Sequence, residues 1–65
     1  MRIMVNDEMK LITSRFLSEA LIELGYAGAK VATAIDGVFV PRSAREGRAL
    51  EEGAHLEILA PMQGG

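Results

Sequence analysis

The residues of this chain with the clearest chemical use are its last two, Gly64 and Gly65. They follow Pro61-Met62-Gln63 and place a carboxylate on a residue that has no side chain. Such a carboxylate can attack the α-phosphate of ATP to form an acyl-adenylate, from which an external nucleophile displaces AMP. Glycine suits this chemistry because its backbone adopts conformations closed to other residues. Its small size also lets the end enter a narrow channel, so the chain would be a substrate and not a catalyst.

The tail alone leaves a second interpretation open, because chain ends are usually loosely ordered whatever their composition. The residues before the tail therefore have to decide between a frayed end and a presented reactive group. We expect residues 1–60 to form one domain and residues 61–65 to form a flexible C-terminal tail ending in Gly-Gly.

Composition excludes several classes of function. The chain has 65 residues, of which 49% are hydrophobic and 25% are charged, as expected for one small globular domain. It has no cysteine, which excludes disulfides, thiolate zinc sites and a thiol nucleophile. His55 is the single histidine, so a paired-histidine metal site and a Ser-His-Asp triad within the chain are also excluded. The simplest interpretation of His55 is an ordinary polar residue on a strand.

The charge and hydropathy patterns point to a cytoplasmic protein. No stretch approaches the ~20 apolar residues that span a bilayer, so we expect no membrane contact. The N-terminal residues become polar and acidic too soon for a signal peptide. The net charge of −2 argues against nucleic acid as a partner, since its binders usually carry a basic surplus.

Alternating hydrophobic residues predict five strands. Residues 2–6 and 9–12 form a hairpin around a turn at residues 6–8, and residues 31–35 and 38–40 form another around Asp36-Gly37. Residues 55–60 form the last strand, and Pro61 ends it. A two-residue turn would place Phe39 opposite Ile35 and a bulged residue would reverse this, so the face that Phe39 takes is left open.

One amphipathic helix is expected between the hairpins. Phe16, Leu17, Ala20, Leu21 and Leu24 recur at helical spacing. The candidate N-caps are Thr13 and Ser14, and Gly25 suits a left-handed C-cap. Residues 43–52 predict a short helical turn and loop that Leu50 anchors to the core.

The order of these elements predicts an α+β fold, the β-grasp or ubiquitin-like roll, in which a mixed sheet of about five strands packs on one main helix. The expected core comprises Ile3, Val5, Leu11, Leu17, Leu21, Leu24, Val31, Ile35, Leu50, Leu56 and Ile58. The opposite face of the sheet would carry Met4, Ala32, Ala34, Glu57 and Leu59. An apolar face of this kind favours a protein partner, although loops or a second copy of the chain could also cover it. A docking patch of Arg42, Arg45 and Arg48 is weighed against a solvated charged surface.

The whole chain resembles the ThiS-type sulfur carriers of thiamine biosynthesis. The resemblance rests on Val40-Pro41-Arg42, on Leu50-Glu51-Glu52-Gly53 and on Met62-Gln63-Gly64-Gly65. Two turn positions depart from the family pattern, because Asp36-Gly37 stands where Asn-Gly is frequent and Ala54 stands where aspartate is frequent.

This resemblance implies a set of partners. An E1-like adenylyltransferase, using ATP and magnesium, would activate the carboxylate of Gly65, and a cysteine desulfurase persulfide would supply sulfur for a thiocarboxylate. Thiazole synthase would then receive the sulfur, and the chain itself would bind no cofactor. Gly65 and Gly64 would form the reacting end, and the residues expected to bind these partners are Gln63, Met62, Met4, Ala34, Leu59 and Arg42.

Other interpretations remain open at this point. A molybdopterin-type sulfur carrier and a ubiquitin-like protein modifier use the same tail chemistry. A strand-swapped DNA-binding domain is a different class, suggested by the terminal segment 52–58. The last alternative is a protein-interaction domain whose Gly-Gly end has no chemical role.

Overall fold

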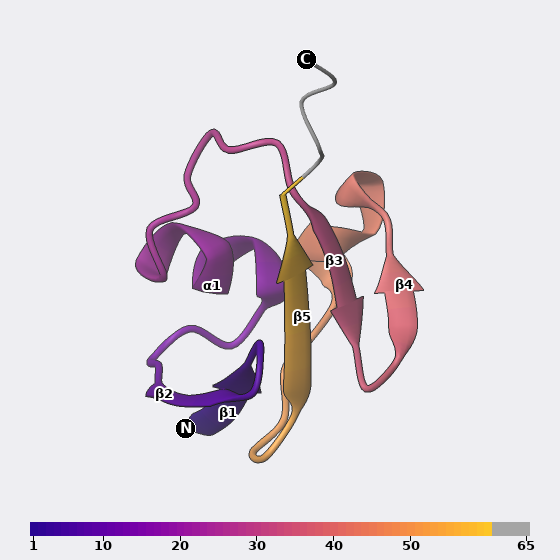
Figure 1. Cartoon of the computed structure of the whole chain (residues 1–65). Coiled ribbons are helices and arrows are strands. Elements are labelled where there is room, and N and C mark those ends of the chain that lie inside the picture. Colours follow the sequence, from indigo (N-terminus) through magenta and orange to yellow (C-terminus); the bar gives the residue numbers. More distant parts are fainter. Residues whose placement is uncertain (61–65) are drawn as a thin grey trace.

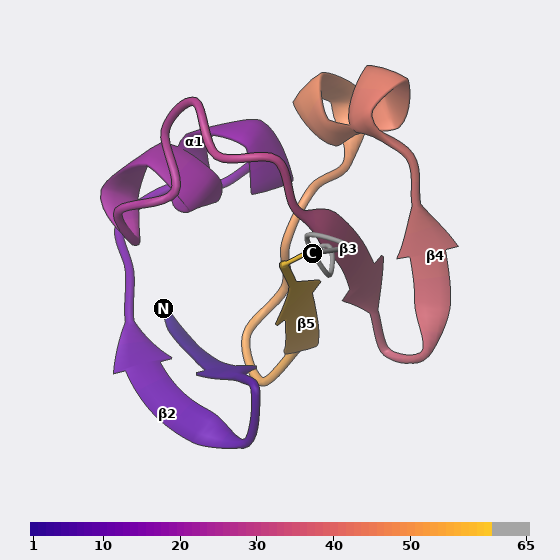
Figure 2. The ribbon, with the colours of Figure 1, turned by 45° about the horizontal axis from the view of Figure 1, so that its top comes forward.

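The computed structural model describes residues 1–60, and this part of the chain forms one mixed sheet with one α-helix packed against it. The elements are β1 (Arg2–Val5), β2 (Glu8–Leu11), α1 (Leu17–Glu23), β3 (Ala32–Ile35), β4 (Val38–Val40), the 3₁₀ helix η1 (Arg42–Gly47) and β5 (His55–Leu59). The strand order is β2-β1-β5-β3-β4 (Figure 1). In Figure 2 the sheet curves around the side that holds α1. The predicted β-grasp is therefore confirmed.

The last strand lies at the centre of the sheet. β5 pairs with β1 in parallel, with Met4 opposite His55, and with β3 in antiparallel register from Ala32↔Leu59 to Ile35↔Leu56. β5 lies between β1 and β3, so the segment suggested as a terminal hairpin arm is the central strand of the sheet.

Both hairpins use two-residue turns with left-handed backbone angles. Asn6 and Asp7 have φ of 49° and 67°, and Asp36 and Gly37 have φ of 50° and 82°. Two consecutive positive φ values define the type I′ turn, whose twist matches that of the flanking strands. The second hairpin pairs Ile35 with Val38 and Ala34 with Phe39. The cross-strand partner of Ile35 is therefore Val38 and not Phe39. Phe39 faces the outer side of the sheet together with Ala34.

Asn6 fastens β5 to the first hairpin. Its side-chain Nδ2 donates to the carbonyl of Ile58 at 3.0 Å, and its Oδ1 accepts from the Ile58 N–H at 2.8 Å. The amide thus replaces a peptide group and continues the parallel ladder after β1 has turned away. Its own backbone N–H donates to Leu56 at 3.0 Å. These bonds set the position of the end of β5, from which residues 61–65 follow.

We expect Asn6→Gly to lower the free energy of unfolding by about 1–3 kcal/mol, because it leaves the Ile58 N–H and C=O without their side-chain partner. Glycine tolerates the positive φ of this position, so the loss reports the hydrogen bonds and not the backbone. Urea denaturation followed by circular dichroism measures the change. Asp7→Gly, in the same turn and also at positive φ, is the control and should cost nothing. Equal losses in the two variants would contradict the role assigned to the amide.

The core follows the prediction with one clear error. The buried hydrophobic residues are Ile3, Val5, Ile12, Leu17, Ala20, Leu21, Ile35, Val40, Leu50, Ala54, Leu56 and Ile58, and the half-buried Leu24, Tyr26 and Val31 pack against them. Leu11 was expected in this core but is 74% exposed. It pairs with Arg2, and cross-strand partners share a face, so it lies on the outer side of the sheet. Ile12, directly after β2, enters the core instead and is 3% exposed.

This register predicts opposite outcomes for two neighbouring aliphatic residues. Ile12→Ala should destabilise the fold by about 2–5 kcal/mol because it opens a cavity. Leu11→Ala should stay within about 0.5 kcal/mol of the wild type because the side chain is solvated. Thermal and urea unfolding of both variants measure the difference. A larger loss at Leu11 would mean that the first hairpin has another register.

The start of the helix differs from the prediction. The N-cap position is Phe16, and no side chain caps it. Thr13 and Ser14 instead bond the carboxylate of Glu23 in the last turn, with the Ser14 hydroxyl donating at 2.6 Å and the backbone N–H groups of both residues also donating. The Ser14 hydroxyl bond is the largest cause of a lowered pKa of Glu23, and the backbone N–H groups add to it. The expected N-cap residues therefore fasten the entry loop to the end of α1.

The end of the helix agrees with the prediction. Gly25 has φ of 96°, and its N–H donates to Ile22 while the Tyr26 N–H donates to Leu21 at 2.7 Å. This bond pair is the Schellman motif that a left-handed glycine permits. It turns the chain back over the core, where Tyr26 packs.

Candidate functional site

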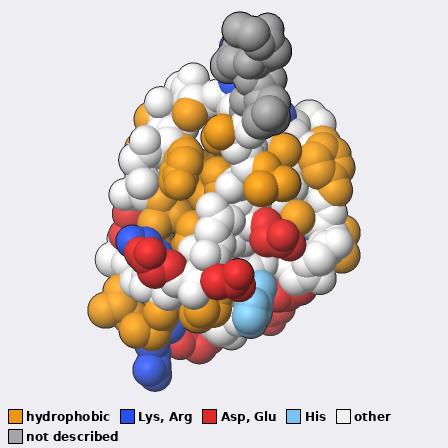
Figure 3. All heavy atoms as spheres, in the orientation of Figure 1, with side chains coloured by type: hydrophobic (Ala, Val, Ile, Leu, Met, Phe, Trp, Pro, Cys, Tyr) orange, Lys and Arg blue, Asp and Glu red, His pale blue; other side chains and the backbone are white. Residues whose placement is uncertain are grey.

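The outer face of the sheet, opposite α1, gathers exposed hydrophobic side chains. Register places Met4 and Met9 on it as one cross-strand pair and Ala34 and Phe39 as another. On β5 the outward positions are His55, Glu57 and Leu59, because Leu56 and Ile58 between them are buried. Figure 3 shows hydrophobic side chains on this side of the molecule, separated by acidic groups and the histidine. We call this surface the outer face.

The predicted binding residues of the folded domain divide into two places. Met4 and Ala34 are half-buried on the outer face, and Leu59, 63% exposed, lies at the end of β5. Arg42 is exposed as the first residue of η1, beyond β4. The remaining predicted residues, Met62, Gln63, Gly64 and Gly65, lie outside the described residues.

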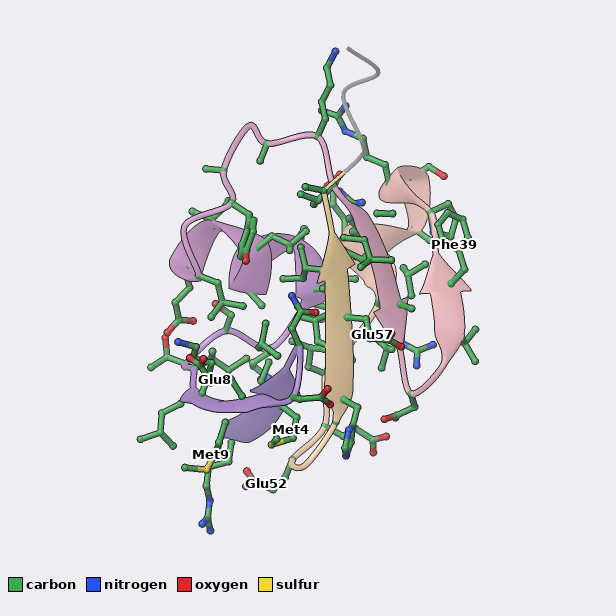
Figure 4. All side chains as sticks on the ribbon, in the orientation of Figure 1. Met4, Glu8, Met9, Phe39, Glu52 and Glu57 are labelled. Carbon is green, nitrogen blue, oxygen red and sulfur yellow. The ribbon has the colours of Figure 1, made fainter. Side chains whose placement is uncertain are left out.

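An open hollow of about 460 Å³ lies on the outer face beside β5. Met4, Leu56 and Leu59 supply its apolar lining, and Asn6, Asp7, His55 and Glu57 supply its polar lining. Figure 4 shows Met4 and Glu57 on β1 and β5, the two central strands that border it. The hollow therefore brings together two of the predicted residues, Met4 and Leu59, beside a rim of acidic side chains.

His55 is exposed on β5 and its backbone is part of a structural contact. Its N–H donates to Asp36 Oδ1 at 3.0 Å, and the Asp36 N–H donates to its carbonyl at 2.8 Å. These bonds hold the start of β5 to the turn of the second hairpin. Among residues 1–60, no three His, Asp or Glu side chains gather as a metal ion would require. In the same range, no helix is long and apolar enough to cross a membrane.

The three arginines proposed as one patch have different roles. Arg45 is partly buried: its Nε donates to Thr33 Oγ1 at 3.1 Å and its Nη2 donates to the carbonyl of Val31 at 2.5 Å. The Thr33 hydroxyl, itself buried, donates to the carbonyl of Val40 at 2.8 Å. Arg45 therefore joins η1 to β3 and β4, whereas Arg42 and Arg48 are exposed. The three arginines therefore do not form one solvent-exposed patch.

The edge strand β2 carries an ion pair. Lys10 Nζ lies 2.7 Å from Glu8 Oε1, and this hydrogen bond lowers the pKa of the Glu8 carboxyl and raises that of the Lys10 ammonium. Glu8 and Lys10 pair with Val5 and Ile3, so they lie on the helix side of the sheet at its edge. Charges in such a position discourage another strand from adding to the edge. The Glu8–Lys10 pair therefore protects this edge of the sheet.

Comparison with known proteins identifies the family. A family model described as the ThiS family matches residues 3–65. The chain belongs to the ThiS family.

Two solved structures of relatives agree with this assignment. A crystal structure of the thiamine biosynthesis protein ThiS from Geobacter metallireducens is 26% identical, covers 100% of both chains and superposes with a TM-score of 0.85. An NMR solution structure of a thiamine biosynthesis protein from the same organism is 25% identical, covers 100% of this chain and 88% of that one, and has a TM-score of 0.78. No curated protein matches the chain at the required level of similarity.

Two departures from the ThiS pattern noted in the sequence are accommodated by the fold. Asp36 keeps the positive φ of a type I′ turn, and its carboxylate accepts the His55 N–H described above. Ala54 is buried against the core, and its carbonyl accepts the Met4 N–H at 2.9 Å. Both positions therefore keep the contacts that hold β5 between its neighbours.

Several residues of the ThiS outer face were not found from sequence. Phe39 was left undecided and Leu11 was assigned to the core, although the strand registers place both on the outer face. The signal was present in each case as a two-residue turn, Asn6-Asp7 or Asp36-Gly37, whose type fixes the register of the strands that follow. Asp7, which lines the hollow on the outer face, gave no signal, because an isolated charge in a turn carries no periodicity.

Proposed function

We propose that this chain carries sulfur for thiamine biosynthesis, as a thiocarboxylate formed on Gly65. The observation that carries the proposal is the ThiS family match, which extends through residue 65 and so includes the Gly-Gly end. The relative from Geobacter metallireducens is called a thiamine biosynthesis protein and aligns over its full length. The same function accounts for a small domain whose outer face exposes hydrophobic side chains.

The proposed chemistry has three steps. The Gly65 carboxylate attacks the α-phosphate of ATP and releases pyrophosphate, which leaves an acyl-adenylate. A cysteine persulfide formed by a desulfurase then attacks the acyl carbon and displaces AMP. Reduction of the resulting acyl disulfide by a thiol leaves the thiocarboxylate, which gives its sulfur to thiazole synthase. The absence of cysteine from this chain means that no internal thiol intercepts the activated end.

The chain takes part in these steps as a substrate. An E1-like adenylyltransferase would hold the ATP and magnesium and supply the catalytic groups. The outer face is the surface by which this enzyme would recognise the domain. Its exposed apolar side chains and acidic rim match the usual anatomy of a transient interface, with an apolar centre and a polar edge.

Deletion of Gly65 should abolish activation while the fold stays intact. Removing one residue draws the carboxylate back by about 3.5 Å, out of reach of a fixed active site. ATP-dependent pyrophosphate release by the adenylyltransferase measures activation, and circular dichroism of the variant controls for folding. Gly65→Pro should give the same loss, because proline fixes the backbone angle that glycine leaves free. Unchanged pyrophosphate release from the shortened chain would refute the proposal.

Intact mass of protein isolated from cells distinguishes the related functions. A sulfur carrier should contain a species in which sulfur replaces one oxygen at Gly65. A protein modifier should instead appear linked through Gly65 to lysines of other proteins. Thiazole auxotrophy after deletion of the gene would assign the pathway, and growth without added thiazole would contradict it.

The outer face should matter for recognition but not for chemistry. Leu59→Ser should raise the carrier concentration for half-maximal pyrophosphate release by about tenfold and leave the maximal rate nearly unchanged. Ile22→Ser is the matched control, because Ile22 is exposed to 64% on α1, away from the outer face, compared with 63% for Leu59. Equal effects of the two substitutions would show that the enzyme does not use the outer face.

A further inference from the structure

A second hollow lies where β5 ends. It measures about 360 Å³ and is bounded by the segment leading into β3, by the start of η1 and by the end of β5. Its lining residues are Ala29, Lys30, Val31, Ala32, Arg42, Arg45, Leu59 and Ala60. We call it the basal groove, because residues 61–65 follow directly from Ala60 at its rim.

The charge of the basal groove is opposite to that of the chain. Lys30, Arg42 and Arg45 are its charged lining residues, and all three are cations. The whole chain, in contrast, carries nine acidic and seven basic residues. The hollow on the outer face is lined by Asp7 and Glu57 and by no lysine or arginine. The surface near β5 is thus cationic at the end of the strand and acidic beside its middle.

One of the three cations is fixed in place. Arg45 is held by Thr33 Oγ1 and the Val31 carbonyl through Nε and Nη2, and a guanidinium has five N–H donors in a rigid fork. Its Nη1 donors take no part in the bonds formed among residues 1–60. The two hydrogen bonds already orient the guanidinium in the free protein, so a ligand need not immobilise this side chain when it binds. The planar fork suits the two oxygens of a carboxylate.

The rest of the lining selects the kind of ligand. Val31, Ala32, Leu59 and Ala60 give the groove an apolar floor beside its cations. A fully hydrated ion gains nothing from such a floor, whereas a peptide segment buries its aliphatic side chains there. The occupant that fits both features has carboxylates next to aliphatic residues.

We propose that the basal groove binds an acidic segment of the protein that takes up the tail, with its carboxylates on Arg42, Arg45 and Lys30. This inference rests on the proposed function, since it assigns a contact of the adenylyltransferase. Held there, the partner would grip the domain directly at the base of residues 61–65. The opposite polarity of the two hollows would also fix the direction in which the domain docks.

The first experiment reverses the two exposed cations of the groove in the full chain. Lys30→Glu with Arg42→Glu should raise the half-saturating concentration in pyrophosphate release by about tenfold at low salt, with the maximal rate retained. The difference from wild type should shrink as salt increases. The control, Arg15→Glu with Arg48→Glu, makes the same change in net charge at exposed arginines outside the groove. Equal effects of the two double variants overturn the proposal.

The second experiment does not depend on the adenylyltransferase. Nuclear magnetic resonance titration of the full chain with a short Glu-Leu-Glu-Glu peptide should shift the amide signals of Lys30, Arg42, Leu59 and Ala60 in a saturable way. The Lys30→Glu, Arg42→Glu variant should lose these shifts. Inorganic phosphate at equal ionic strength should not reproduce them. Equal shifts with phosphate would mean a simple anion site, and absent shifts with the peptide would mean no site, so either result overturns the proposal.

The two experiments separate this inference from the function on which it rests. A wild-type chain that the adenylyltransferase does not activate contradicts the proposed function, whatever the groove binds. If the chain is activated equally well with and without the groove cations, the proposed binding of an acidic segment is contradicted and the proposed function is not.

Discussion

The structure depends on one pairing, that of β5 with β1 and β3 together. This strand supplies Leu56 and Ile58 to the core and closes the sheet between two hairpins that are otherwise separate. Backbone pairing to β1 covers two residue pairs, and the Asn6 amide extends it to Ile58. Without β5, each hairpin would be a two-stranded ribbon, which is marginal in water. The strand that precedes the tail is therefore also the one that completes the fold.

The alternation of β5 gives one short segment two functions. Its inward side chains are nearly inaccessible, while His55, Glu57 and Leu59 face the surface. A one-residue slip would exchange the two sets, and the contacts of Asn6 and Asp36 on either side of the strand oppose such a slip. The geometry of the outer face and the stability of the core are consequently set by the same hydrogen bonds. The polarity along the strand, acidic beside its middle and cationic at its end, adds a direction to that surface.

The element order, the helix stripe and most of the core could be predicted because each depends on local periodicity. Leu11 and Ile12 show where this reasoning fails. Both are aliphatic and adjacent, and only the register set by the Asn6-Asp7 turn decides which of them is buried. The prediction that Thr13 or Ser14 caps the helix was wrong for another reason. Their partner Glu23 lies at the far end of α1, and its carboxylate takes the hydrogen bonds that local capping would use. Arg45 could not be distinguished from Arg42 or Arg48, because its anchor, Thr33, is a buried hydroxyl on a different strand. The chemistry proposed for Gly64-Gly65 is also inferred from sequence alone, and these residues lie outside the described part of the chain, so it stays a prediction.

The Asn6 clamp joins residues separated by 52 positions. The first hairpin is therefore synthesised well before the strand with which it pairs. Pairing between segments so distant in sequence slows folding, because the chain entropy is lost before the long-range contacts form. A partner that grips the end of β5 would therefore select finished molecules. Such a partner would distinguish folded from unfolded chains, since a domain without a paired β5 offers neither the outer face nor the basal groove.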